Sequence, residues 1–135
     1  MGRARILLAD DHAEFLALTA ALVGSEFDVL QTYGDGQTLV DDPAVADADL
    51  LVLDISMTGF SGIDAALQLH AAGSPVKIVF LTVHEDPDYL RSALATGALG
   101  YVVKRRLASD LIPALRAALA GERFVSAGVG GERTA

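Results

Sequence analysis

The stretch Leu50-Leu51-Val52-Leu53-Asp54 constrains the fold of this chain more than any other. Four consecutive aliphatic residues are typical of a strand buried on both faces, as in a parallel sheet covered by helices on each side. The strand ends in a carboxylate, which such a sheet places at its carboxyl edge, where open α/β folds bind their ligands. Asp54 is therefore the first candidate for a functional residue.

Strand and helix patterns alternate along the rest of the chain, without an internal repeat. Further strands are predicted at residues 5–9, 27–32, 76–82 and 100–103. Helices are predicted at residues 13–23, near 39–40, at 61–72, from 87 to about 97 and at 108–120. This alternation predicts the α/β class, as a (βα)5 doubly wound parallel sheet.

Local signals support the first, fourth and last of these helices. Asp86 is predicted to cap the fourth helix, with Pro87 at its first position. Pro113 is predicted near the first turn of the last helix, where a proline costs least. Apolar stripes at three- and four-residue spacing are predicted for the first and last helices, at Phe15, Leu18, Thr19 and Leu22, and at Leu111, Ile112, Leu115 and Leu119.

Composition limits the function classes. With 135 residues, of which 52% are hydrophobic, the chain suits one domain with its own core. The net charge of −8 argues against direct binding to nucleic acid, and the absence of cysteine excludes disulfides and zinc-thiolate sites. No apolar run approaches the ~18 residues that cross a bilayer, and the start lacks the pattern of a signal peptide. We expect a cytoplasmic protein without membrane contact.

Polar residues follow four of the five predicted strands. Asp10-Asp11 end the first strand, Asp54 the third and Thr82 the fourth, and Lys104 follows the fifth. If these strands are neighbours, the side chains converge, and crowded carboxylates need a cation to offset their repulsion. Oxygen ligands of this kind suit Mg²⁺, and a hydroxyl with a lysine suits an anion. Together they indicate phosphoryl transfer.

Each residue also has a simpler interpretation. Asp10 or Asp11 would serve equally well as a cap of the first helix. Asp54 would also fit as the cap of a turn, although its place at the end of so apolar a strand argues against that role. Threonine is common in strands and lysine is usually a solvated surface residue, so neither Thr82 nor Lys104 is informative alone. The combination at four strand ends favours the site.

This pattern resembles the receiver domain of two-component response regulators. The matching residues are Asp10-Asp11, Asp54-Ile55-Ser56-Met57 with Gly62 downstream, Thr82, Tyr101 and Lys104. The resemblance covers residues from about 5 to 121, nearly the whole chain. It implies a flavodoxin-like sheet of order 2-1-3-4-5, with the site at the switch point between the first and third strands.

The resemblance also implies a role for each residue. Asp54 is then the phosphoacceptor, which takes a phosphoryl group from a sensor histidine kinase. The implied Mg²⁺ ligands are Asp11, Asp54 and the backbone carbonyl of Ser56, with Asp10 assisting through water. Lys104 and the Thr82 hydroxyl would bind phosphoryl oxygens. Tyr101 would be the switch residue behind Thr82; without the resemblance, it is simply an amphipathic residue on an edge strand.

Three stretches resemble the NarL-type subfamily, whose members usually have a C-terminal helix-turn-helix of the LuxR type: residues 10–12, 81–85 and 97–104. We therefore expect a receiver domain at residues 1–121, followed at 122–135 by a flexible tail or the start of a linker to an effector domain. DNA would be contacted through that effector domain alone. A stand-alone receiver and a homodimer remain open alternatives.

Four residues depart from the receiver pattern. Thr58 replaces the usual proline after Met57, Val83 is larger than the usual residue beside Thr82, and Arg105 replaces a small residue after Lys104. His84 occupies a position at which the family tunes hydrolysis of the acyl phosphate. These departures affect the expected rates and remove no essential group.

Two other functions fit parts of this pattern. A Mg²⁺-dependent phosphatase with an aspartyl nucleophile usually has a second aspartate two residues later, where this chain has Ser56. A degenerate receiver that acts as an interaction module would be expected to lack an intact site. We therefore expect a signalling switch that catalyses only its own phosphorylation and dephosphorylation.

Overall fold

The computed structural model describes residues 2–129. Its centre is a parallel sheet of six strands in the order β2-β1-β3-β4-β5-β6. The strands are β1 (Arg5–Ala9), β2 (Asp28–Tyr33), β3 (Leu50–Leu53), β4 (Lys77–Thr82), β5 (Gly100–Val103) and β6 (Phe124–Val125). The predicted doubly wound flavodoxin-like fold and the order 2-1-3-4-5 are confirmed, and β6 extends the sheet.

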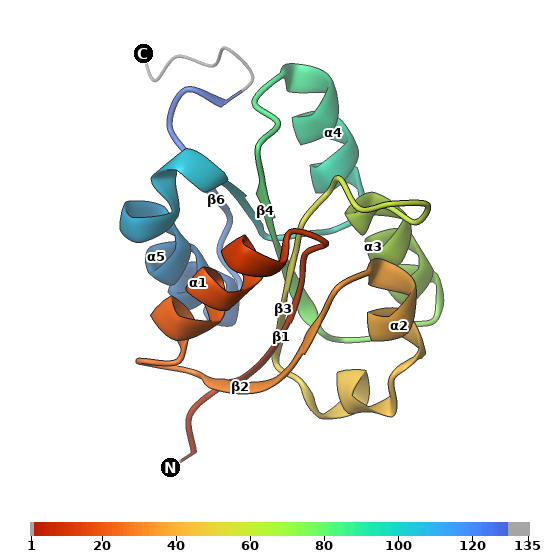
Figure 1. Ribbon diagram of the computed structural model, residues 1–135. Coiled ribbons are helices and arrows are strands. Elements are labelled where there is room, and N and C mark those ends of the chain that lie inside the picture. The colour runs from red at the N-terminus through yellow and green to blue at the C-terminus, as the bar shows by residue number, and fades with distance from the viewer. Residues whose placement is uncertain (1, 130–135) are drawn as a thin grey trace.

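Helices cover both faces of the sheet (Figure 1). The α-helices are α1 (Ala13–Val23), α2 (Gly36–Asp41), α3 (Gly62–Ala71), α4 (Pro87–Ala95) and α5 (Leu107–Leu119), and the 3-10 segments are η1 (Pro43–Asp47) and η2 (Lys104–Arg106). The side chain of Asp86 caps α4 by accepting the N–H of Tyr89, as predicted. None of the helices in residues 2–129 has the length and apolar character needed to cross a bilayer.

The strand β3 has the environment that its sequence predicts, with all four side chains buried. Leu51 and Leu53 point into a core shared with α2, α3 and α4. Leu50 and Val52 point into a second core shared with α1 and α5. Because both faces are covered, Asp54 is left at the carboxyl end of a rigid strand.

The predicted apolar stripes of α1 and α5 are only partly correct. Leu111 and Leu115 are fully buried, but 56% of Leu18 and 40% of Leu119 are exposed. A period of three or four residues defines a stripe but not its width, and the sheet covers less of these helices than the pattern suggests. Pro113 lies inside α5 on its exposed side, not near the first turn as predicted.

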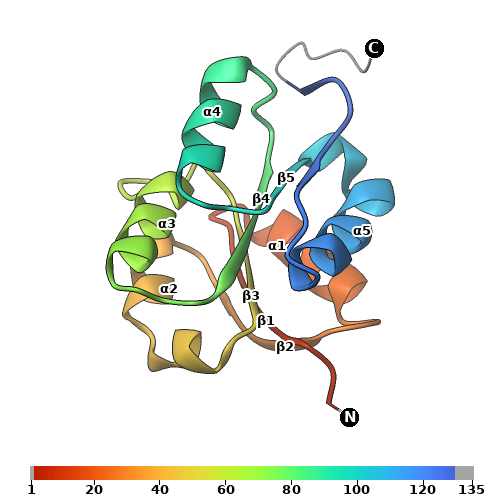
Figure 2. The ribbon, with the colours of Figure 1, turned by 180° about the vertical axis from the view of Figure 1, so that it is seen from behind.

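The structure differs from the predicted tail at residues 122–129. Phe124–Val125 pair with β5 as a sixth strand, and the side chains of Ser126 and Val129 are buried. The Ser126 hydroxyl donates to Asp110 of α5 at 2.7 Å and accepts the Val103 N–H at 3.2 Å. Figure 2 shows this segment passing β5 between α4 and α5. It covers an edge that β5 would otherwise expose; residues 130–135 of the predicted tail lie outside the described part.

Candidate functional site

The three predicted carboxylates meet at the carboxyl edge of the sheet. Asp10 and Asp54 are fixed just beyond β1 and β3, because their backbone N–H groups donate to Tyr33 and Ala9 at 3.0 Å. Carboxylate oxygens of Asp10, Asp11 and Asp54 all lie within 4.8 Å of one another. Asp10 and Asp54 are each 5% exposed, whereas Asp11 is exposed. The sheet therefore assembles the predicted acidic cluster.

Lys104 lies against this cluster. Its Nζ atom is 2.7 Å from Oδ2 of Asp10 and 3.1 Å from Oδ2 of Asp54. The ammonium also lies 4.5 Å from the centre of the Phe15 ring, which favours a cation on its face. The Lys104 side chain is 11% exposed, so the simpler interpretation as a solvated surface lysine is wrong.

The pKa shifts follow from burial and from these contacts. Burial raises the pKa of Asp54, the Lys104 charge lowers it, and the Asp10 charge raises it, with a net upward shift. Burial lowers the pKa of Lys104, but hydrogen bonds and charges from Asp10 and Asp54 outweigh it and the net shift is also upward. One ammonium thus contacts two buried carboxylates, and it offsets the burial of the Asp54 charge only in part.

The charge count and the donor set fit a divalent cation. Three carboxylates against one ammonium leave two negative charges, which equal the charge that one Mg²⁺ would neutralise. Carboxylate oxygens are suitable ligands for this ion. Asp11 has a further role, because its Oδ2 accepts the N–H and the hydroxyl of Thr58, both at 3.2 Å. Thr58 therefore anchors the loop after Asp54 to the cluster.

The helix-cap interpretation of the two aspartates does not describe the structure. His12 is the N-cap of α1, and its side chain makes no capping bond. Asp10 instead uses Oδ1 to accept the backbone N–H of His12 at 2.8 Å and Oδ2 to contact Lys104. Both oxygens are thereby oriented at the edge of the sheet.

Thr82 and Tyr101 are both buried in the adjoining strands. The Thr82 hydroxyl oxygen accepts the N–H of His84 at 3.3 Å. The Tyr101 hydroxyl donates to the His84 carbonyl at 2.8 Å, and burial followed by the charge of Asp86 raises the pKa of that hydroxyl. Tyr101 is 0% exposed and β6 covers its strand, so the alternative of an amphipathic edge residue is wrong.

Sequence reasoning missed three contacts of the loop after β4. The His84 imidazole is hydrogen-bonded to the Ser56 hydroxyl and stacks on Tyr89 of α4, with ring centres 3.8 Å apart. Glu85 accepts two hydrogen bonds from Arg105, each 2.8 Å long. The two hydrogen-bonded pairs join residues 28 and 20 positions apart, so no local signal could have predicted them.

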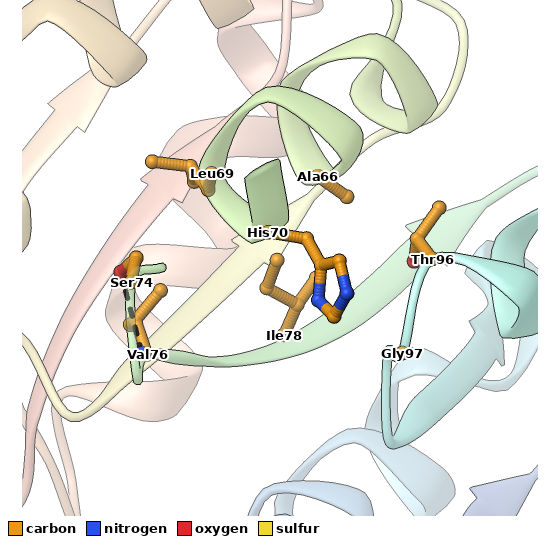
Figure 3. A pocket seen from close by; sticks show the side chains of 8 residues that line it. All are labelled: Ala66, Leu69, His70, Ser74, Val76, Ile78, Thr96 and Gly97. Carbon is orange, nitrogen blue, oxygen red and sulfur yellow. Dashed lines mark hydrogen bonds between the residues drawn. The ribbon is translucent and has the colours of Figure 1, made fainter. Parts of the chain in front are cut away.

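A small cavity between α3 and the segment that follows α4 has no part in this site. It has a volume of about 50 Å³ and its lining includes His70, Ser74 and Thr96 (Figure 3). It also borders Ile78 near the start of β4, whereas Asp54 lies beyond the end of β3. His70 is exposed on α3.

Comparison with known families agrees with the geometry. Residues 6–116 match the model of the response regulator receiver domain family. The chain belongs to this family. The resemblance predicted from the strand-end residues is therefore confirmed for nearly the whole receiver domain.

Curated relatives of this receiver domain are longer regulators. The transcriptional regulatory protein PdtaR of Mycobacterium tuberculosis is 34% identical over 124 residues, which are 91% of this chain and 60% of that protein. The transcriptional regulatory protein DegU of Brevibacillus brevis is 29% identical over 123 residues, 90% of this chain and 52% of that protein. The chain thus spans little more than half the length of these relatives.

Solved structures agree with the NarL-type assignment. A LuxR-family two-component response regulator from Aurantimonas sp. SI85-9A1 superposes with a TM-score of 0.89 at 27% identity, over 97% of this chain and 95% of that chain. The isolated receiver domain of RcsB from Salmonella enterica serovar Typhimurium, solved with phosphomimetic BeF3⁻, gives a TM-score of 0.85 at 26% identity, over 95% and 96%.

Proposed function

We propose that this receiver domain is a phosphorylation-dependent signalling switch, which accepts a phosphoryl group from a sensor histidine kinase onto Asp54. The observation that supports this most is the placement of Asp54, buried at the end of β3 between an acidic pair and Lys104. Its catalysis would be limited to its own phosphorylation and dephosphorylation.

Asp54 would act as the nucleophile. A carboxylate oxygen forms a bond to phosphorus, the bond from phosphorus to the donor nitrogen breaks, and the donor imidazole keeps the electron pair. Mg²⁺, held by Asp11, Asp54 and the Ser56 carbonyl with Asp10 assisting through water, would supply positive charge to the phosphoryl oxygens. Lys104 would exchange its contact with Asp54 for a phosphoryl oxygen, because its ammonium already lies 3.1 Å from the nucleophile.

Thr82 and Tyr101 would transmit the change. The Thr82 hydroxyl would turn from the His84 N–H toward a phosphoryl oxygen, and the loop after β4 would follow because Tyr101 is hydrogen-bonded to His84. This motion would alter the face formed by α4, β5 and α5. A bistable loop of this kind is a common way to convert a local charge change into a new surface.

The proposed output is control of transcription in the cytoplasm. The relatives PdtaR and DegU are named as transcriptional regulatory proteins, and this chain spans little more than half of each. DNA contact would then require a C-terminal helix-turn-helix domain, and the receiver would control it alone or as a homodimer. A stand-alone receiver that acts through protein contacts is the alternative.

Asp54→Asn tests the assignment. Wild type treated with Mg²⁺ and acetyl phosphate should gain one phosphoryl group by intact-protein mass spectrometry, and Asp54→Asn should gain none. Asp88→Asn, which changes an exposed carboxylate on α4, is the matched control and should behave as wild type. Equal modification of Asp54→Asn and wild type would show that the phosphoacceptor lies elsewhere.

A further inference from the structure

Arg105 already holds a carboxylate beside the proposed site. Its Nε and Nη2 atoms donate to the two carboxylate oxygens of Glu85, each at 2.8 Å. This is the paired geometry with which a guanidinium recognises any carboxylate. The contact joins the loop after β4 to the residue that follows Lys104.

Arg105 also lines an open hollow beside Lys104, whose ammonium contacts Asp54. The hollow has a volume of about 320 Å³ and is lined by His12, Phe15, Val83, Lys104 and Arg105. None of these five residues is acidic, although the chain has a net charge of −8. Lys104 connects the hollow with the nucleophile, since its Nζ atom contacts Asp54. The hollow is therefore an entrance lined by two basic side chains, each of which is already paired with a carboxylate.

The direction of phosphoryl transfer places the leaving group at this entrance. The attacking and leaving atoms lie on opposite sides of phosphorus. Because Asp54 attacks from the buried end of the site, the leaving group departs on the solvent side. An acyl phosphate releases a carboxylate, which keeps the electron pair of the broken P–O bond and needs no proton. Phosphoramidate releases ammonia, which has no negative charge to offer a guanidinium.

We propose that Arg105 is a specificity-determining residue that favours small acyl phosphates as phosphodonors, by binding their departing carboxylate in the hollow. This inference rests on the proposed phosphorylation of Asp54. Glu85 occupies the same guanidinium fork and competes with the donor. Replacing Glu85 by the carboxylate of the donor costs little free energy, because exposed ion pairs are weak. The Arg105 and Glu85 side chains are 55% and 39% exposed.

The test compares two donors in variants of the same protein. The rate of Asp54 phosphorylation is measured with acetyl phosphate and with phosphoramidate at saturating Mg²⁺, and the ratio of the two rates is taken. Arg105→Met should lower this ratio about three- to tenfold, and Glu85→Gln, which frees the guanidinium, should raise it about twofold. Arg105→Lys should fall between wild type and Arg105→Met.

The ratio separates donor recognition from a merely structural role. Both Arg105→Met and Glu85→Gln break the same ion pair, so a loss of loop structure would shift both variants in one direction. Arg91→Met removes an exposed, paired arginine on α4 and should leave the ratio unchanged. Ratios that equal wild type, or that move the same way in both variants, would overturn the role of Arg105. A wild type that neither donor phosphorylates would overturn the proposed function itself.

Discussion

Lys104 and Arg105 are adjacent in the sequence, and both pair with carboxylates, yet their surroundings are opposite. The Lys104 side chain is 11% exposed and lies between two buried aspartates. The Arg105 side chain is 55% exposed and pairs with a single glutamate. One step along the chain separates a buried ionic group from a surface ion pair.

Burial, more than geometry, decides how much an ion pair contributes to the stability of the fold. The Arg105 contacts are as short as those of Lys104, but water screens exposed charges and an exposed pair adds little stability. A buried carboxylate without its cation is costly, because no water replaces the lost partner. Arg106 is intermediate: it pairs with Asp110, whose side chain is 8% exposed.

The largest expected effect is that of Lys104→Met. The free energy of unfolding at pH 7 should fall by about 3 kcal/mol, because Asp10 and Asp54 then face each other without a cation. Urea denaturation followed by far-ultraviolet circular dichroism measures it. Arg105→Met is the matched control and should unfold like wild type. Equal losses in the two variants would contradict the comparison.

The intermediate pair joins Arg106 and Asp110. Asp110→Ala should lower the free energy of unfolding by about 2 kcal/mol at pH 7. Burial raises the pKa of Asp110, but hydrogen bonds from Arg106, Ser126 and Ser109 outweigh burial and lower it below 3.8. Its stabilisation is therefore present above pH 3.8 and is lost as the pH falls through the lowered value. Unfolding curves of wild type and variant should converge in acid. A difference that persists there would argue against the ionised network.

Asp54→Asn should stabilise the fold, by about 1 kcal/mol at pH 7, as expected for a site kept for function at a cost in stability. The folded-state pKa of Asp54 is raised above 3.8, so wild type gains stability as the pH falls through that raised value. The advantage of the variant should therefore shrink between neutral pH and pH 3.8. A constant advantage, measured by thermal unfolding across this range, would exclude Asp54 as the titrating group.

The smallest expected effect concerns the exposed pair. Glu85→Gln, Arg105→Met and the double variant should all unfold like wild type, because both side chains are solvated. A double-mutant cycle at low and at high salt measures the coupling directly. A clear coupling energy that survives high salt would show that this pair is structural after all.

Most of the fold follows from local sequence patterns. The bounds of α1 and β5 and the cap of α4 by Asp86 agree with the sequence predictions, because a helix or strand is set by residues a few positions apart. The candidate site was also predictable in outline. Parallel strands deliver their ends to one edge, so Asp10, Asp54 and Lys104 had to be neighbours once the strand order was assigned.

The order of the elements and the residues at the strand ends follow from the amino-acid sequence. The pairing of Lys104 with two carboxylates and that of Arg105 with Glu85 depend on how the chain packs in three dimensions. The same holds for β6, which pairs with the strand of Tyr101 and is followed by the buried Ser126. These contacts join residues 16 to 94 positions apart, and their partners are chosen by chain packing and burial. Hydrophobic periodicity relates residues only a few positions apart, so it does not predict these contacts.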